Sequence, residues 1–334
     1  MAADDNEAMN LPLPAAFAAN TAAASSTAAS SSAALPQGAV RLQDWGVIRA
    51  AGAEAAKFLH GQLTQDVEHL GDASARLAGY CTAKGRLLAS FVMWRRGPEE
   101  ILLACSADLL PAVLKRLSMF VLRSKCKLSD ASAELPLWGL AGDAAALAPA
   151  GAWSRASAGD AELIRLPDAV VDGQALPRAL CVAGAAPQAA PLDIEAWRWL
   201  EALSGVARIT AATVEQFVPQ MVNLELVGGV NFQKGCYPGQ EIVARSQYRG
   251  TLKRRGQVFH SSAALQPGQE VFHSADPEQP AGMVVLAGSW AGQHAALVEL
   301  KLAALAGGAL HVASLAGPML TLAALPYEIP ADAA

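Results

Sequence analysis

The chain has 334 residues, of which 53% are hydrophobic and only 16% charged, and its formal net charge is −5. A chain of this length can bury a large core, and it favours two or three domains. The acidic balance argues against a whole-molecule electrostatic grip on nucleic acid. No run approaches the roughly 20 uninterrupted apolar residues that a membrane span requires. We therefore expect a soluble globular protein with no membrane association.

The first 40 residues contain no Lys or Arg, whereas Asp4, Asp5 and Glu7 come early. This pattern matches neither the basic start of a signal peptide nor an Arg-rich transit peptide, so we expect a cytoplasmic location. Residues 15–34 are nearly all Ala, Ser and Thr, which offer too little apolar surface to offset the entropy of ordering. We assign residues 1–38 to a disordered tail.

Structured sequence begins near Val40. Apolar residues over 42–48 predict a strand, and Leu59, Leu63, Val67 and Leu70 then recur at helical spacing after Gly52. The two short apolar runs 86–94 and 100–105 flank a Gly-Pro turn, which predicts a β-hairpin.

Ser106 follows that hairpin as a candidate N-cap. Apolar residues recur every three or four positions from Leu109 to Val121, Phe120 included, so we expect an amphipathic helix with Lys115 and Arg116 on its far side. The first part of the chain therefore mixes strands and helices.

The middle of the chain, residues 135–191, is rich in Ala, Gly and Pro with short apolar runs at 162–166 and 179–182, and it predicts a second α+β unit. Beyond Gly256, short strand candidates alternate with turns at Pro267-Gly268, Asp276-Pro277 and Gly307-Gly308. This spacing is typical of a small β-barrel or sandwich.

A dense group of glycines, cations and one cysteine occupies residues 219–256. Cys236 follows Lys234, and a neighbouring cation favours the thiolate, which is both the nucleophilic and the metal-binding form. The alternative is an inert cysteine packed in a connecting loop. The five cysteines are odd in number with no CxxC pair, so we expect reduced thiols and no zinc site.

Cations are concentrated in residues 231–256, where Glu241 is the only acid. Six of them give residues 231–256 a balance of +5: Lys234, Arg245, Arg249, Lys253, Arg254 and Arg255. A polyglutamate tail, a phosphate or an RNA backbone would suit such a segment. A solvated basic face explains the same composition.

The motif KGCYPGQE at 234–241, with IVAR, YRG and KR after it, resembles the signature of the YgfZ family. These are folate-binding, tRNA-modifying proteins that maintain iron–sulfur enzymes, and they are related to the glycine-cleavage T-protein aminomethyltransferase. The resemblance extends over LQDWGVI at 42–48, GQLTQDV at 61–67, AKGRLL at 83–88, the run VPQMVNLELVGGVNFQKGCY and the terminal LPY.

The resemblance implies an α+β fold in which three domains surround a central channel, with a β-barrel at the C-terminal end. We expect a discontinuous folate-binding α+β domain over 39–134 and 192–250, a second α+β domain over 135–191, and the barrel over 251–330.

The resemblance also implies that the channel holds tetrahydrofolate or a related folate. Trp45 and Trp197 match two family tryptophans, and an aromatic face can stack on a pterin or aminobenzoyl ring. From the residues alone, each of these tryptophans is better explained as core.

The resemblance further assigns the motif residues to the site, with Cys236 as the catalytic candidate. The others form a predicted anion-binding motif: Lys234, Gly235, Tyr237, Gly239, Gln240, Glu241, Arg245 and Arg249.

The T-protein carries a catalytic carboxylate at the place where this chain has Ala89 and Ser90. A Ser hydroxyl cannot replace a carboxylate in proton transfer or in stabilising iminium charge. The resemblance therefore favours a folate-binding factor that supports iron–sulfur client enzymes, including tRNA-modifying ones. The alternatives are an aminomethyl transferase and an RNA-binding protein. We do not expect direct nucleic-acid binding, because few aromatic residues accompany the cations.

Overall fold

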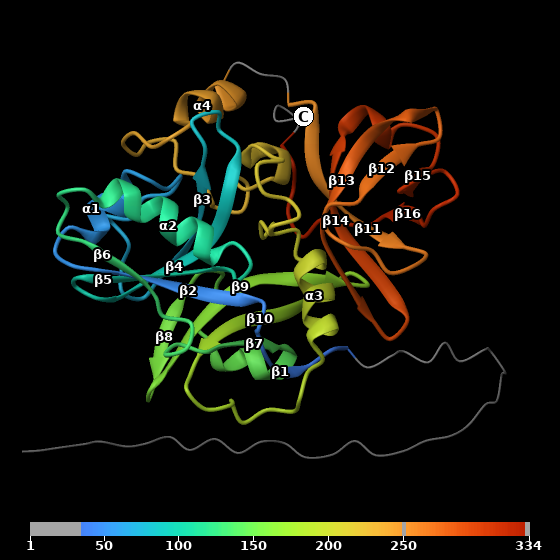
Figure 1. Cartoon of the computed structure of the whole chain (residues 1–334). Helices are drawn as coiled ribbons and strands as arrows, with labels where there is room; N and C mark the ends of the chain where they lie inside the picture. The colour runs from blue at the N-terminus through green and yellow to red at the C-terminus, as the bar shows by residue number, and fades with distance from the viewer. Residues whose placement is uncertain (1–34, 249–251, 331–334) are drawn as a thin grey trace, which may run out of the picture. The chain divides into compact units, whose positions relative to one another are not determined.

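The computed structural model describes residues 35–248 and 252–330. The first 34 positions of the predicted tail therefore lie outside the described residues. The chain divides into residues 1–34 and residues 35–334, and all the described helices and strands belong to the second unit (Figure 1). None of the helices in the described part of the chain has the length and hydropathy that crossing a membrane requires.

The first sheet has the strand order β3-β4-β5-β2-β6 and is entirely antiparallel. Its strands are β2 (Trp45–Ala51), β3 (Ala75–Cys81), β4 (Leu87–Gly97), β5 (Glu100–Ser106) and β6 (Lys127–Asp130). The predicted hairpin is confirmed as β4 and β5. Helix α2 (Leu110–Val121) packs on this sheet and buries Leu110, Val113 and Leu117. Phe120, which the periodicity places on the buried face, is instead exposed at the end of the helix.

Two sequence predictions in this region are wrong in detail. Ser106 does not cap α2, because it ends β5 and its Oγ accepts a hydrogen bond from Arg208. The helix predicted from Gly52 onward ends early, since α1 covers only Ala55–His60. The chain then turns to let Thr64 N donate to Gly79 O at 2.9 Å, so tertiary pairing with β3 overrides the helical spacing. The later apolar residues of that segment are still buried.

The second sheet is also antiparallel, with the order β1-β7-β10-β9-β8. Its strands are β1 (Gly38–Arg41), β7 (Leu137–Ala141), β8 (Arg155–Ala158), β9 (Ala161–Val171) and β10 (Gln174–Val182), and the short 3-10 helix η1 (Gly142–Leu147) follows β7. The apolar runs 162–166 and 179–182 fall in β9 and β10.

A closed six-stranded barrel ends the described chain, as the turn spacing predicts. Its strands are β11 (Arg254–Ser261), β12 (Glu270–His273), β13 (Asp276–Trp290), β14 (Gln293–Lys301), β15 (Leu310–Val312) and β16 (Met319–Leu322), with η3 (Leu302–Leu305) after β14. Asp276-Pro277 opens β13 rather than forming the turn itself. The domain boundaries drawn from the sequence stay a prediction.

Helix α3 (Ile194–Leu203) packs against the second sheet and against the barrel strands β13 and β14 (Figure 1). Two glycines allow this close approach. A Cβ on Gly139 would lie 2.7 Å from the Trp197 ring, and one on Gly288 would lie 2.1 Å from the backbone nitrogen of Trp199. Since α3 touches both the sheet and the barrel, its polar side chains are held at their junction. The remaining helices of the described residues are η2 (Pro219–Val222) and α4 (Gln240–Tyr248).

Candidate ligand-binding cleft

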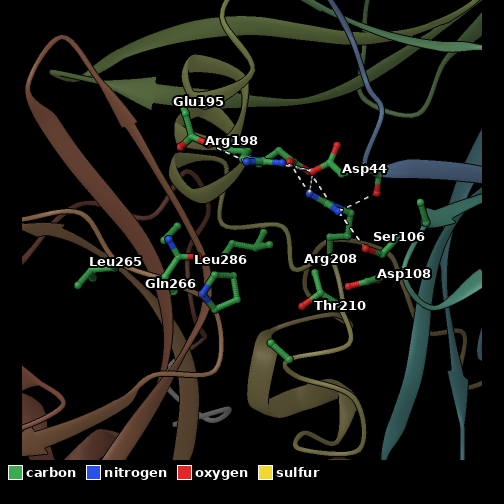
Figure 2. Close-up of a pocket in the computed structure, with 15 residues that line it drawn as sticks. Asp44, Ser106, Asp108, Glu195, Arg198, Arg208, Thr210, Leu265, Gln266 and Leu286 are labelled. Carbon is green, nitrogen blue, oxygen red and sulfur yellow. Dashed lines mark hydrogen bonds and ion pairs between the residues drawn. The ribbon is translucent and has the colours of Figure 1, made fainter.

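A cleft of about 510 Å³ opens where the first sheet, helix α3 and the barrel meet (Figure 2). Its polar wall comes from the Asp44 turn, the end of β5, and α3 with the segment that follows it. Its apolar wall comes from the barrel, through Leu265, Pro267 and Leu286. The polar lining residues are Asp44, Ser106, Asp108, Glu195, Arg198, Glu201, Arg208, Thr210 and Gln266.

Arg208 is the centre of the polar wall. It is buried, and its guanidinium donates to Glu201 through Nε and Nη2, at 3.1 and 3.0 Å, and to Asp44 Oδ2 through Nη2 at 3.1 Å. Burial alone would lower the pKa of Arg208, but Glu201 and Asp44 raise it above its ordinary value. Arg208 is therefore a permanent cation whose position two carboxylates determine.

Asp44 connects this pair to the opening of the cleft. Its Oδ2 also accepts from Arg198 Nη2 at 3.2 Å, and Arg198 Nη1 donates to Glu195 at 2.7 Å. The other oxygen, Asp44 Oδ1, is buried and has no hydrogen-bond partner among the described residues. Four carboxylates and two guanidinium groups line the cleft, so its wall is acidic. Such a wall suits a ligand that donates N–H groups.

A smaller inner cavity of about 30 Å³ adjoins the cleft and shares Glu201 and Arg208 with it. This volume holds roughly one water molecule. Trp45 lines it with its ring 5.0 Å from the Arg208 guanidinium, a cation–π distance. Trp45 Nε1 is buried without a hydrogen-bond partner among the described residues.

Trp197 is fully buried, and it is not among the residues that line either cavity. Arg178 lies over its ring at 5.5 Å and itself lines the inner cavity. Burial lowers the pKa of Arg178 to about 10, and its guanidinium donates to Pro167 O at 3.2 and 3.0 Å. Arg178 therefore lies between the Trp197 ring and the inner cavity. The contact of Trp197 with folate stays a prediction.

Ser90, which the resemblance aligns with the T-protein carboxylate, lines the inner cavity and accepts a hydrogen bond from Ile209 N at 3.0 Å. Glu201 lines the same cavity, but both of its oxygens are bound by Arg208. The carboxylate in this cavity is thus occupied in an ion pair.

The KGCYPGQE loop is fixed largely through its backbone neighbours. Lys234 Nζ donates to His60 O and, at 2.9 Å, to Leu63 O, and it lies 4.8 Å from the centre of the buried Tyr237 ring. Burial lowers the pKa of Lys234 to about 8 and raises that of Tyr237. Among the five free cysteines, which are all in the described part of the chain, Cys236 is the exposed one.

Gly239 has a φ of +82°, and a Cβ there would lie 2.3 Å from Thr82 O, so this position requires glycine. The loop therefore packs closely against the turn that precedes β4. Gln240 begins α4, whereas Glu241 and Arg245 are exposed on it. Arg249 lies outside the described residues.

The cations after residue 231 are not all free to bind an anion. Arg254 pairs with Glu299, and the fully buried Arg255 pairs with Glu225. Both acids lie outside residues 231–256, so the local excess of +5 is partly neutralised. Anion binding by the motif stays a prediction. Arg245 and Lys253 are exposed, so they are accessible to an anion.

Sequence reasoning missed Asp44, Arg178, Arg198, Glu201 and Arg208 as a group. A signal existed at Glu201, which is a single acid among apolar residues in WRWLEAL. An acid placed in this way is buried only with a partner. The partners come from residues far apart in sequence, which the spacing could not bring together.

The chain has an aminomethyltransferase-like fold. The structure matches the crystal structure of the glycine cleavage system aminomethyltransferase T from Bartonella henselae with a TM-score of 0.67, covering 87% of this chain and 86% of the other, at 15% identity. This likeness confirms the predicted fold class.

The sequence is 33% identical over 232 residues to the tRNA-modifying protein YgfZ of Serratia proteamaculans, and 36% identical over 235 residues to that of Edwardsiella ictaluri. Both matches cover 66% of this chain and 70% of the relative. The chain belongs to the YgfZ family. No protein-family model matches the sequence.

Proposed function

We propose that the cleft binds a folate, and that the folate-bound protein supports the assembly or repair of iron–sulfur enzymes, including tRNA-modifying ones. The observation that carries the proposal is the cleft of about 510 Å³, whose polar wall is held in place by the buried Arg208–Glu201–Asp44 network. The name of the relatives, tRNA-modifying protein YgfZ, supports the class of client.

The chemistry of the lining fits a pterin. One edge of this ring system carries an amino group, a ring N–H and a carbonyl oxygen. The Asp44, Asp108 and Glu195 carboxylates of the cleft can accept N–H groups, and the Arg198 guanidinium can donate to a carbonyl oxygen. A bound folate would supply a carried one-carbon unit or redox equivalents of its ring. These residues of the chain would hold and orient it.

The size of the two cavities locates the ring. A cleft of about 510 Å³ lies within the range of ligand pockets, roughly 300–1,000 Å³. The inner cavity of about 30 Å³ is far too small for a pterin. The ring therefore belongs in the cleft, and contact with the inner face of Trp45 requires that Trp45 or Arg178 move.

The acidic wall also orients the rest of the ligand. A folate tail ends in glutamate carboxylates, which four wall carboxylates would repel. Arg198 is the cation nearest the opening, with 37% of its side chain exposed. We place the tail toward Arg198 and solvent.

Cys236 acts elsewhere in this proposal. Helix α4, which follows its loop, lies at the top of the view in Figure 1, apart from α3, and no residue of the loop or of α4 lines the cleft. An exposed thiol is suited to redox exchange or to transient ligation of an iron–sulfur intermediate. Clusters normally take about four protein ligands, so one thiol would share this task with another molecule.

Two alternatives are less well supported. An aminomethyl transferase would need its catalytic carboxylate at the position where this chain has Ser90, which offers only a hydroxyl. An RNA-binding role for the motif is weakened because Arg254 and Arg255 already form ion pairs with Glu299 and Glu225.

The test has two separate parts. Calorimetric titration with tetrahydrofolate should show binding that Asp44→Asn weakens about tenfold, the usual cost of one charge-assisted hydrogen bond. The control is Asp160→Asn, an exposed acid in the turn between β8 and β9. Equal affinity of the two variants would refute the assignment of the cleft.

The second part is complementation of a deletion strain. Cys236→Ala should fold normally, bind folate and yet fail to restore the activities of iron–sulfur enzymes. Full restoration would show that the function does not require Cys236.

A further inference from the structure

A basic and apolar surface at the end of α2 takes no part in either site. We call it the α2 knob and define it by three exposed apolar residues and four exposed cations: Met119, Phe120, Leu122, Lys115, Arg123, Lys125 and Lys127. The segment from Leu109 to Ser129 contains no Asp or Glu. In a chain of net charge −5, this is a local concentration of positive charge.

The apolar part of the α2 knob is unusually exposed. Met119 is 58% exposed, Phe120 45% and Leu122 86%. Leu122 follows the last residue of the helix. Its φ is +45°, a backbone conformation that residues other than glycine and asparagine rarely adopt. The helix end thus directs a large apolar side chain into solvent, and Phe120, Leu122 and Arg123 line a hollow beside it.

The cations around this centre are available. None of the four takes part in an ion pair within the ranges that the structure describes. The acid that lines the hollow, Glu54, accepts a hydrogen bond from the backbone N–H of Lys125. The α2 knob therefore combines an apolar centre with a rim of unpaired positive charge.

We propose that the α2 knob docks an acidic protein surface with an apolar centre, and that this surface belongs to an iron–sulfur client enzyme. The inference rests on the proposed function for the identity of the partner. A buried apolar centre with a charged rim is the usual anatomy of a protein interface. RNA binding would call for several stacking aromatics, whereas Met119 and Leu122 cannot stack. The cationic rim selects a partner that is acidic around its contact point.

The experiment measures binding of the purified full chain to a purified iron–sulfur enzyme whose activity depends on it, by biolayer interferometry at low and high salt. Met119→Ser/Leu122→Asn should weaken binding about tenfold, because exposed apolar anchors dominate interface affinity and Asn tolerates positive φ. Arg123→Glu/Lys125→Glu should weaken it similarly and reduce its salt dependence. Met319→Ser/Leu322→Ser, which changes an apolar pair on β16 that is 49% and 53% exposed, should bind as the parent does.

Three outcomes overturn the proposal: no binding of the parent chain to the client enzyme, parent-like binding by both α2 knob variants, or loss of affinity for a tRNA transcript or anionic phosphatidylglycerol vesicles with client binding unchanged. Tetrahydrofolate titration of the same variants should match the parent. Failure of folate binding in the parent would refute the proposed cleft ligand. The binding of the client enzyme to the α2 knob would still be tested independently.

Discussion

The cleft and the KGCYPGQE loop differ in what holds their side chains in place. In the cleft, Arg208, Glu201 and Asp44 hold one another through side-chain ion pairs at the junction of the two sheets and the barrel. In the loop, Lys234 binds backbone carbonyl groups and Gly239 meets a backbone oxygen, while Cys236 is left exposed. The KGCYPGQE motif thus largely fixes the local backbone, whereas residues with no sequence motif, Arg208, Glu201 and Asp44, build the polar wall of the cleft.

The largest expected effect separates the two regions by stability. Arg208→Met leaves the buried Glu201 without its cation and Asp44 with Arg198 alone, so we expect the free energy of unfolding to fall by about 3–5 kcal/mol in urea denaturation. Adding Glu201→Gln to Arg208→Met should recover part of the loss, because the unpaired charge is removed. An unchanged midpoint in the single variant would mean that the network is not formed in solution.

The loop should respond to backbone changes. Gly239→Ala adds a Cβ at a left-handed position and against Thr82 O, so we expect a loss of about 2 kcal/mol or more in the same assay. Gly235→Ala is the matched control. Its Cβ would lie 3.6 Å from His60 Nε2, an ordinary contact, and we expect a change within about 0.5 kcal/mol. Equal losses would argue against the packing described for Gly239.

Folate binding should distinguish the two tryptophans of the proposed site. Trp45→Ala is expected to weaken tetrahydrofolate binding about tenfold, because the Trp45 ring lies 5.0 Å from the Arg208 guanidinium and helps to hold the polar wall of the cleft. Trp197→Phe should have the smaller effect, because its ring lies behind Arg178. Calorimetry measures both. A larger effect at Trp197 would show that the ligand displaces Arg178.

The smallest effect is a pH dependence at Lys234. Its pKa is lowered to about 8 in the folded chain from an ordinary value near 10.5, so between these values the unfolded chain binds the additional proton. Stability of the parent should therefore rise relative to Lys234→Met as pH increases from about 8 to 10.5. Denaturation of both proteins across this range is the measurement. A constant difference would indicate that Lys234 is solvated.

The sequence predicts the strands well where apolar runs are short and bounded by Gly or Pro, as in β4, β5 and the barrel. It fails after His60, because the burial of Leu63, Val67 and Leu70 follows helical spacing without a helix. The site shows the same limit. Glu201 and Arg208 are close in sequence, but Asp44 and Arg178 join them only through the packing of α3 between sheet and barrel, which no local pattern specifies.

The glycine at 288 bears on how the cleft can evolve. Since the β13 backbone reaches the α3 backbone with no side chain between them, the width of the opening is set by main-chain contact. Substitutions at Arg198, Gln266 or Leu286 can then change which molecule is accepted while leaving the frame in place. Selectivity and architecture are, in this protein, separately adjustable.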